Sequence, residues 1–180
     1  FGAQETVDLV VDKLNDDDNE TVREEAAAGV ITTFTESDFD EGGAVRQEAI
    51  EKMAEEVSTD VSAEFATIVE ESPRKTEQRN AAWLLGQLET STPEAIDTLI
   101  ATLDDEDDNL RKIASASLTK LDQADVEDKI DAFLEGVDED SEAHTLASFV
   151  LSALHSGKEA KKEMVEYTRV TDPSDYTSSE

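Results

Sequence analysis

Cysteine is absent from this chain of 180 residues, and proline, glycine and aromatic residues are few. The missing thiols exclude disulfide bonds, thiolate metal sites and cysteine nucleophiles. No apolar run approaches the roughly 18 residues that a membrane-spanning helix needs, and no signal-peptide pattern is visible. We therefore expect a cytoplasmic protein that has no membrane partner.

Basic residues are also scarce, since 15 Lys and Arg stand against 46 Asp and Glu and the formal net charge is -31. Such a charge destabilises a compact state in dilute buffer, but at about 1 M salt the Debye length shrinks to about 3 Å and the repulsion is screened. The composition is typical of proteins from extreme halophiles, and an acidic chaperone of basic proteins is the alternative explanation. Because this surface repels phosphate, we expect no nucleic-acid partner.

What the sequence does contain is helical periodicity. Apolar residues recur at positions i, i+3, i+4 and i+7, which places them on one face of a helix. Three sets with this spacing are Val7, Val10, Val11 and Leu14; Ile96, Leu99, Ile100 and Leu103; and Ile130, Phe133, Leu134 and Val137. The pattern predicts an all-α protein.

A second kind of helix follows each apolar stripe, after a short and mostly acidic connection. In this helix a small Ala comes three residues after a polar position, and a larger apolar residue follows it. Five segments fit: Val22, Arg23, Ala26 and Val30; Val45, Arg46, Ala49 and Met53; Gln78, Ala81 and Leu85; Leu110, Arg111, Ala114 and Leu118; and Ala143, His144, Ala147 and Leu151. Gln78, Arg111 and His144 are 33 residues apart. This period predicts an α-solenoid, a superhelix of about four to five stacked helical hairpins.

The second helices resemble those of the HEAT-repeat family, especially the short HEAT-like repeats of the phycobilisome-lyase type. The stretches DDDNETVREEAAAGV, QRNAAWLLGQL and NLRKIASASLTKL carry the resemblance, which covers most of residues 2–155. With the acidic composition, it suggests a halophilic archaeal source. It implies a repeat array over residues 1–157 that continues before Phe1, and second helices that line the inner surface. Residues 158–180 are expected to form a last helix and a disordered tail.

The array is expected to be irregular at one place. Residues 36–43 replace the first helix that the Val45 and Arg46 helix would need, so this unit is expected to be truncated.

The acidic connections have a structural explanation, because carboxylates satisfy the free N–H groups and the positive dipole end of a helix start. A weak cation site is the alternative for these clusters, although none of them contains the Gly of a calcium loop. The predicted caps are Asp18, Asp108 and Asp140, with Asn19, Asp107 and Ser141 beside them as alternatives.

The resemblance also implies a ladder of ion pairs between the second helix of one repeat and the acidic connection of a neighbour. Arg23, Arg46 and Arg111 occupy the required position, and His144 stands there in the last repeat, where an Arg is usual. Because a guanidinium binds carboxylate and phosphate with the same geometry, an anion-binding row is the alternative interpretation.

No constellation of residues predicts catalysis. The two His are too far apart on one helix to share a metal, and neither a Gly-x-Ser-x-Gly elbow nor a phosphate-binding loop occurs. We therefore assign no catalytic residue, no metal ligand and no cofactor. The residues expected to bind a partner are Arg79, Trp83 and Gln87, because aromatic and Arg side chains often dominate interface energetics. Packing between repeats is the alternative role for Trp83.

These observations favour a non-catalytic scaffold or adaptor that binds another protein in a salt-rich cell. Further repeats of the same chain before Phe1 are a second expected contact. Two other functions stay open at this point. One is a lyase-like enzyme that handles a tetrapyrrole such as phycobilin, because some relatives of the short HEAT-like type are enzymes of this kind. The other is an acidic chaperone of basic proteins.

Overall fold

The computed structural model describes residues 9–14, 20–36, 51–52, 61–88, 92–121 and 123–156. Its α-helices are α2 (Glu20–Glu36), α4 (Ser62–Glu71), α5 (Lys75–Leu85), α6 (Pro93–Ala101), α7 (Asp108–Leu118), α8 (Gln123–Gly136) and α9 (Glu142–Ser156), and a short 3-10 helix, η1 (Thr102–Asp104), follows α6. These ranges contain no strand, and the predicted all-α fold is confirmed. None of the helices described here is long and apolar enough to cross a membrane.

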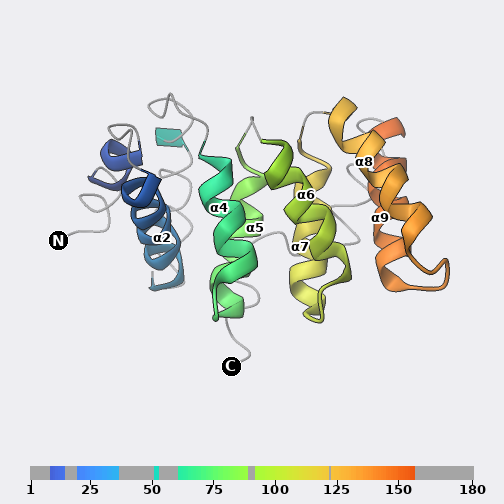
Figure 1. Cartoon of the computed structure of the whole chain (residues 1–180), viewed down its shortest axis with the longest axis horizontal. Coiled ribbons are helices and arrows are strands. Elements are labelled where there is room, and N and C mark those ends of the chain that lie inside the picture. The colour runs from blue at the N-terminus through green and yellow to red at the C-terminus, as the bar shows by residue number, and fades with distance from the viewer. Residues whose placement is uncertain are drawn as a thin grey trace.

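Six helices form three consecutive hairpins, α4 with α5, α6 with α7, and α8 with α9, stacked side by side (Figure 1). The first helices α4, α6 and α8 contact one another in sequence order, and so do the second helices α5, α7 and α9. Every hairpin therefore buries its sides against its neighbours in the chain, which is the arrangement of an α-solenoid.

Local sequence explains where these helices begin. At α6, the Thr92 hydroxyl accepts a hydrogen bond from the Ala95 N–H, and Pro93 occupies the first helical position, where no N–H is needed. At α7, the Asp107 carboxylate accepts from the Leu110 N–H. Ser141 caps α9 in the same way, because its hydroxyl accepts from the His144 N–H at 3.0 Å.

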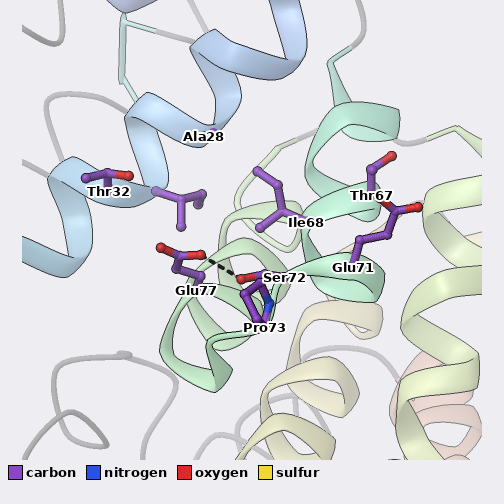
Figure 2. A pocket seen from close by; sticks show the side chains of 9 residues that line it. Ala28, Thr32, Thr67, Ile68, Glu71, Ser72, Pro73 and Glu77 are labelled. Carbon is purple, nitrogen blue, oxygen red and sulfur yellow. Dashed lines mark hydrogen bonds between the residues drawn. The ribbon is translucent and has the colours of Figure 1, made fainter. Parts of the chain in front are cut away.

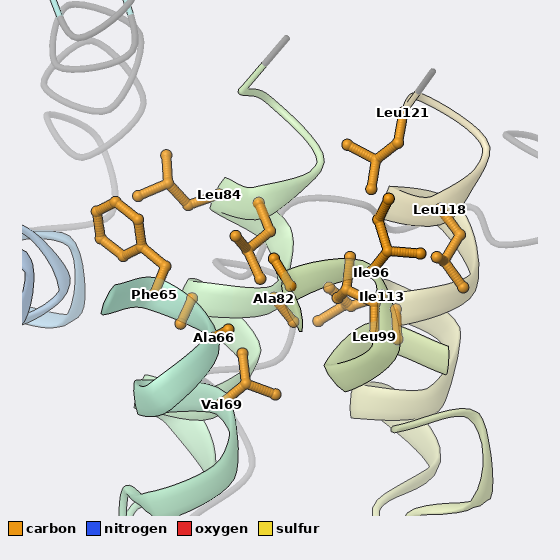
Figure 3. Close-up of a cluster of buried hydrophobic side chains, with 14 of the residues drawn as sticks. Phe65, Ala66, Val69, Ala82, Leu84, Ile96, Leu99, Ile113, Leu118 and Leu121 are labelled. Carbon is orange, nitrogen blue, oxygen red and sulfur yellow. The ribbon is translucent and has the colours of Figure 1, made fainter. Parts of the chain in front are cut away.

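The core lies between the two helix layers and runs continuously through the hairpins. Figure 3 shows its central part, where side chains of α4, α5, α6 and α7 meet. Phe65, Leu84, Leu99 and Leu118 are fully buried there. The periodic apolar residues thus face one another as the sequence predicts.

The second helices α5 and α7 approach each other closely at one point. The Ser117 hydroxyl donates to the Ala82 carbonyl at 2.7 Å. A Cβ atom on Gly86 would lie 2.6 Å from the Ser117 Cα and Cβ atoms. Gly86 has ordinary right-handed backbone angles, so its lack of a side chain provides space rather than conformational freedom.

Helix α2 departs from the prediction, which placed Val22, Arg23, Ala26 and Val30 on the second helix of a hairpin. It runs parallel to α4 and antiparallel to α5 (Figure 1). Near its start, the Arg23 Nε atom lies 2.6 Å from the Glu64 Oε1 atom at the start of α4. Near its end, Ile31 and Thr32 line one cavity together with the last turn of α4.

The first helices α4 and α6 are parallel to each other, as α2 is to α4. Ser62 at the start of α4 bonds Thr92 at the start of α6, and Glu70 at the end of α4 accepts from Thr98 of α6. Helix α2 contacts both α4 and α5, and its buried Ile31 faces this hairpin. An amphipathic stripe fits either side of a hairpin, so the motif alone does not fix the helix direction.

Two other expectations about chain organisation lie outside the described residues. These are the truncated unit that follows residue 36, of which only residues 51–52 are described, and the C-terminal helix and tail within residues 158–180.

The contact at Gly86 gives a direct test of the packing. We expect Gly86→Ala to lower the free energy of unfolding by about 1–3 kcal/mol, because the new methyl group overpacks the interface between α5 and α7. Urea denaturation in molar KCl measures the change. Gly136→Ala is the matched control, since a Cβ there has no neighbour within 4 Å and should be neutral or stabilising by up to about 1 kcal/mol. Equal effects of the two substitutions would contradict the close contact.

Candidate interaction surface

Five of the ten Lys and Arg residues that the structure describes form ion pairs at the seams between neighbouring units of the stack. Arg79 of α5 holds the Asp107 carboxylate at the start of α7 with two bonds, from Nε at 3.2 Å and from Nη2 at 2.5 Å. Both side chains are nearly buried, with exposed fractions of 11% and 13%. A bidentate pair with little solvent access is more strongly stabilising than an exposed ion pair.

The Asp107 carboxylate is also a helix cap, so it receives bonds from two directions. Partial burial alone would raise its pKa, but the hydrogen bonds from Arg79 and from the Leu110 N–H outweigh burial and hold the pKa below its ordinary value. Asp107 therefore stays charged in the folded protein at neutral pH, and it joins α5 to α7.

Further seams contain equivalent contacts. Arg111 of α7 reaches the Glu142 carboxylate of α9 at 2.6 Å and the Asp105 carbonyl at 2.7 Å. In the first-helix layer, Lys129 of α8 pairs with Asp97 of α6. Two further seam pairs among the described residues are Lys75 with Asp105 and Arg23 with Glu64.

These contacts assign places to the residues that the ladder was expected to use. Arg23 connects α2 to α4, and Arg111 connects α7 to α9. Their partners are glutamates, whereas the ladder was expected to use aspartates of the acidic connections. The imidazole of His144 lies 3.4 Å from the Ser148 hydroxyl of its own helix, and it forms no hydrogen bond or ion pair with another hairpin in the described part of the chain. Arg46 lies outside the described residues.

Arg79 is a correction, because it was expected on a partner-binding surface. It bridges α5 and α7 through Asp107, and its guanidinium is therefore not available to a partner. The sequence contained a clue to this role: Arg79 stands beside Gln78, where the predicted ladder position lacks a cation.

At two of the three predicted caps, the residue that caps the helix is the neighbour named as the alternative. Asp107, not Asp108, caps α7, whereas the Asp108 carboxylate bonds Lys112 and Arg111, and the bond from Lys112 lowers its pKa. Ser141, not Asp140, caps α9. Neighbouring Asp and Ser residues compete for such positions, and only the backbone angle at the helix start decides between them. Asp18 lies outside the described residues.

Carboxylates are unevenly distributed over the helices. In α5, α7 and α9 each acidic residue, Glu77, Asp108 and Glu142, lies in the first turn, and none follows it. The first helices differ, because they carry acidic residues along their length. Helix α8 has five of them: Asp125, Glu127, Asp128, Asp131 and Glu135. The second-helix layer is therefore nearly free of negative charge in a chain with 46 acidic residues.

Half-exposed and exposed side chains at equivalent positions of these second helices, or just after them, define what we call the carboxylate-free face. Its members are Trp83 of α5, Gln87 just after α5, Lys112 of α7, Lys120 just after α7, and Thr145 and Phe149 of α9. Trp83 and Phe149 pack against the core with one side and occupy the same place in their repeats. Between them the equivalent residue is Ala116.

Polar groups on this face are few. The Gln87 amide donates to the Trp83 carbonyl at 3.4 Å. Lys120 is exposed as a residue, yet nearby protein atoms partly desolvate its ammonium group and lower its pKa. The face offers aromatic surface, amide and hydroxyl groups, and two ammonium groups, of which the one on Lys112 is paired with Asp108 in the first turn of α7.

In the part of the chain that the structure describes, no group of three or more His, Asp or Glu residues could hold a metal ion. Cavities lined by the described residues include one of about 270 Å³ between α2 and the α4–α5 turn, and one of about 390 Å³ between residues 9–13 and α2. Neither is lined by His144 or His155.

Comparison with known proteins agrees with this architecture. A family model for HEAT repeats matches residues 62–153, just over half of the chain, which contain the hairpins from α4 to α9. A HEAT repeat-containing taxis protein of Halobacterium salinarum is 32% identical over 73 residues, which are 41% of this chain and 16% of that protein. The chain thus spans only a small part of this relative's length.

The seam between α5 and α7 predicts a dependence of stability on pH. We expect Asp107→Asn to lower the free energy of unfolding by about 1–3 kcal/mol at pH 7, because Arg79 loses its charged partner while the amide can still cap α7. The folded pKa of Asp107 lies below its unfolded value of about 3.9, so the stabilisation is present above that pH and is lost as the pH falls through the folded pKa.

The difference between the variant and the parent protein should therefore shrink below about pH 4. Urea denaturation at several pH values in molar KCl measures it. Glu106→Gln, which changes an exposed carboxylate in the same connection, should have little effect at any pH. A constant difference from neutral to acidic pH would show that the Asp107 charge does not contribute.

Proposed function

Because this chain belongs to the HEAT-repeat family, whose repeats generally mediate protein–protein interactions, we propose that it is a non-catalytic scaffold or adaptor. Its partner is another protein, which it binds through the carboxylate-free face. The observation that carries this proposal is the absence of acidic residues from α5, α7 and α9 beyond their first turns. The taxis role named for the Halobacterium relative belongs to that protein, and the shared segment supports the architecture alone.

Composition supports a docking role for this face. The cores of protein interfaces are depleted of charged residues and enriched in aromatic residues, and Trp is prominent among the residues that dominate binding energy. Trp83 is the single Trp of the chain and lies on this face, with Phe149 at the equivalent place two hairpins away. A partner that covers both would contact three hairpins, so the surface suits a large and extended partner.

The sign of the charge on the carboxylate-free face distinguishes the proposed scaffold from a chaperone of basic proteins. A chaperone of that kind would present carboxylates to its partner, and its binding would weaken steeply with salt. The charged members of the face are Lys112 and Lys120, and its aromatic members bind through apolar contact. Binding should therefore persist at molar salt.

A salt-rich environment is part of the proposal. The net charge of -31 and the Halobacterium origin of the relative support it. The many carboxylates on the first helices would repel one another in dilute buffer, whereas molar salt screens them.

Capture experiments test the face. The full chain, immobilised at 2 M KCl, should retain a specific protein from an extract of a halophilic archaeon, and binding of the purified partner should shift the emission of Trp83. We expect Trp83→Ala to weaken binding at least about thirtyfold, the effect of a typical dominant interface residue. The control is Phe133→Ala, which truncates a half-buried aromatic residue in the first-helix layer. Equal binding by both variants, or a loss of binding between 1 and 3 M KCl, would contradict the proposal.

Stability tests the adaptation to salt. The free energy of unfolding should fall markedly when KCl is lowered from 2 M to 0.1 M, because the Debye length grows from about 2–3 Å to about 10 Å and the carboxylates repel one another. NaCl and KCl should act alike at equal ionic strength. If sucrose stabilised the protein as well as salt did, screening would not be the cause.

A further inference from the structure

A groove of about 270 Å³ lies between α2 and the turn that joins α4 to α5, and no member of the carboxylate-free face lines it. It forms where α2 runs along α4. One wall comes from Ala28, Ile31 and Thr32 of α2, and the opposite wall comes from the end of α4 and the start of α5 (Figure 2).

The bottom of the groove is apolar. Ile31 is 1% exposed and forms its floor, Ile68 faces it from α4, and Pro73 closes one end. The hydroxyl groups of Thr32 and Thr67 stand at the sides. Such a site accepts an aliphatic side chain, and it is smaller than the 300–1,000 Å³ that pockets for small-molecule ligands usually have.

The rim is acidic. Glu77 is held in place, because its carboxylate accepts a hydrogen bond from the Ser72 hydroxyl at 2.6 Å (Figure 2) and also pairs with Arg74 at 2.5 Å. Glu71 is exposed and forms no ion pair with the described residues, so it supplies the uncompensated negative charge. An apolar floor below a negative rim is complementary to an aliphatic side chain next to a cation.

We propose that this groove binds a short segment of a partner protein in which a Lys or Arg lies next to Leu, Ile or Met. The aliphatic side chain fills the space between Ile31 and Ile68, and the cation lies against Glu71, with Glu77 as its second neighbour. The carboxylate-free face presents the opposite chemistry, so the two surfaces select different segments, and binding at one does not depend on the other.

Peptide selection on the full chain tests this directly. A display library of random dodecapeptides is selected at 2 M KCl on the parent protein and depleted on Ala28→Trp, in which an indole at an exposed position of α2 covers the groove. Circular dichroism and the melting temperature verify that this variant is folded. Recovered peptides enriched in Lys or Arg beside Leu, Ile or Met support the proposal. If none is recovered, or if the recovered peptides lack this pattern, it is wrong.

A synthetic peptide with the recovered consensus then locates the site. We expect Ala28→Trp to weaken its binding more than tenfold and Glu71→Gln about fivefold, as for loss of one partly exposed ion pair. Glu94→Gln, an equally exposed carboxylate on α6, and Trp83→Ala should leave binding unchanged. An unchanged affinity for Glu71→Gln, or a loss with Trp83→Ala, would overturn the assignment of groove and cation.

Discussion

The close contact between consecutive second helices is the constraint on which the rest of the structure depends. The bond from Ser117 to the Ala82 carbonyl, and the absence of a side chain at Gly86, bring α5 and α7 together without an intervening layer of side chains. This spacing decides which charged groups can meet across a seam. Arg79 reaches the carboxylate that begins α7, and Arg111 reaches Glu142 of α9, because each helix start lies next to the preceding second helix.

The seams in turn explain how so acidic a chain distributes its charge. Carboxylates are favourable at helix starts, where they meet N–H groups and the helix dipole, and the few cations are placed beside them. With only 15 basic residues, cations used at seams are not available to neutralise carboxylates elsewhere. The second helices stay low in negative charge because they contain no Asp or Glu after their first turns.

The sequence predicts the hairpins from α4 to α9 because their information is local: a stripe of apolar residues, an acidic connection, a small Ala and a 33-residue period. It does not predict features that depend on which neighbour a helix meets. The match of VREEAAAGV to a second helix was correct as a local pattern, yet α2 lies along α4, since Val30 and Ile31 can be buried on either side of a hairpin. For the same reason the sequence leaves two alternatives for each cap, and it does not identify the role of Arg79 beside Gln78, because adjacent Asp or polar residues have equal local propensities and only tertiary contacts separate them. The pocket beside Ile68 exists because of that same helix direction and has no signature in the sequence.

Screening by salt changes what a surface of this kind can do. At about 1 M salt the Debye length is about 3 Å, so charges on the first helices neither attract nor repel a partner at a distance. What remains is the cost of desolvation at contact, since a carboxylate buried without a partner costs several kcal/mol at any salt concentration. The advantage of a face without Asp and Glu is therefore a low free-energy cost of desolvation on contact, and not the absence of long-range repulsion. The same reasoning applies to the groove, where Glu71 can contribute only to a cation that touches it, and the apolar floor must supply most of the affinity.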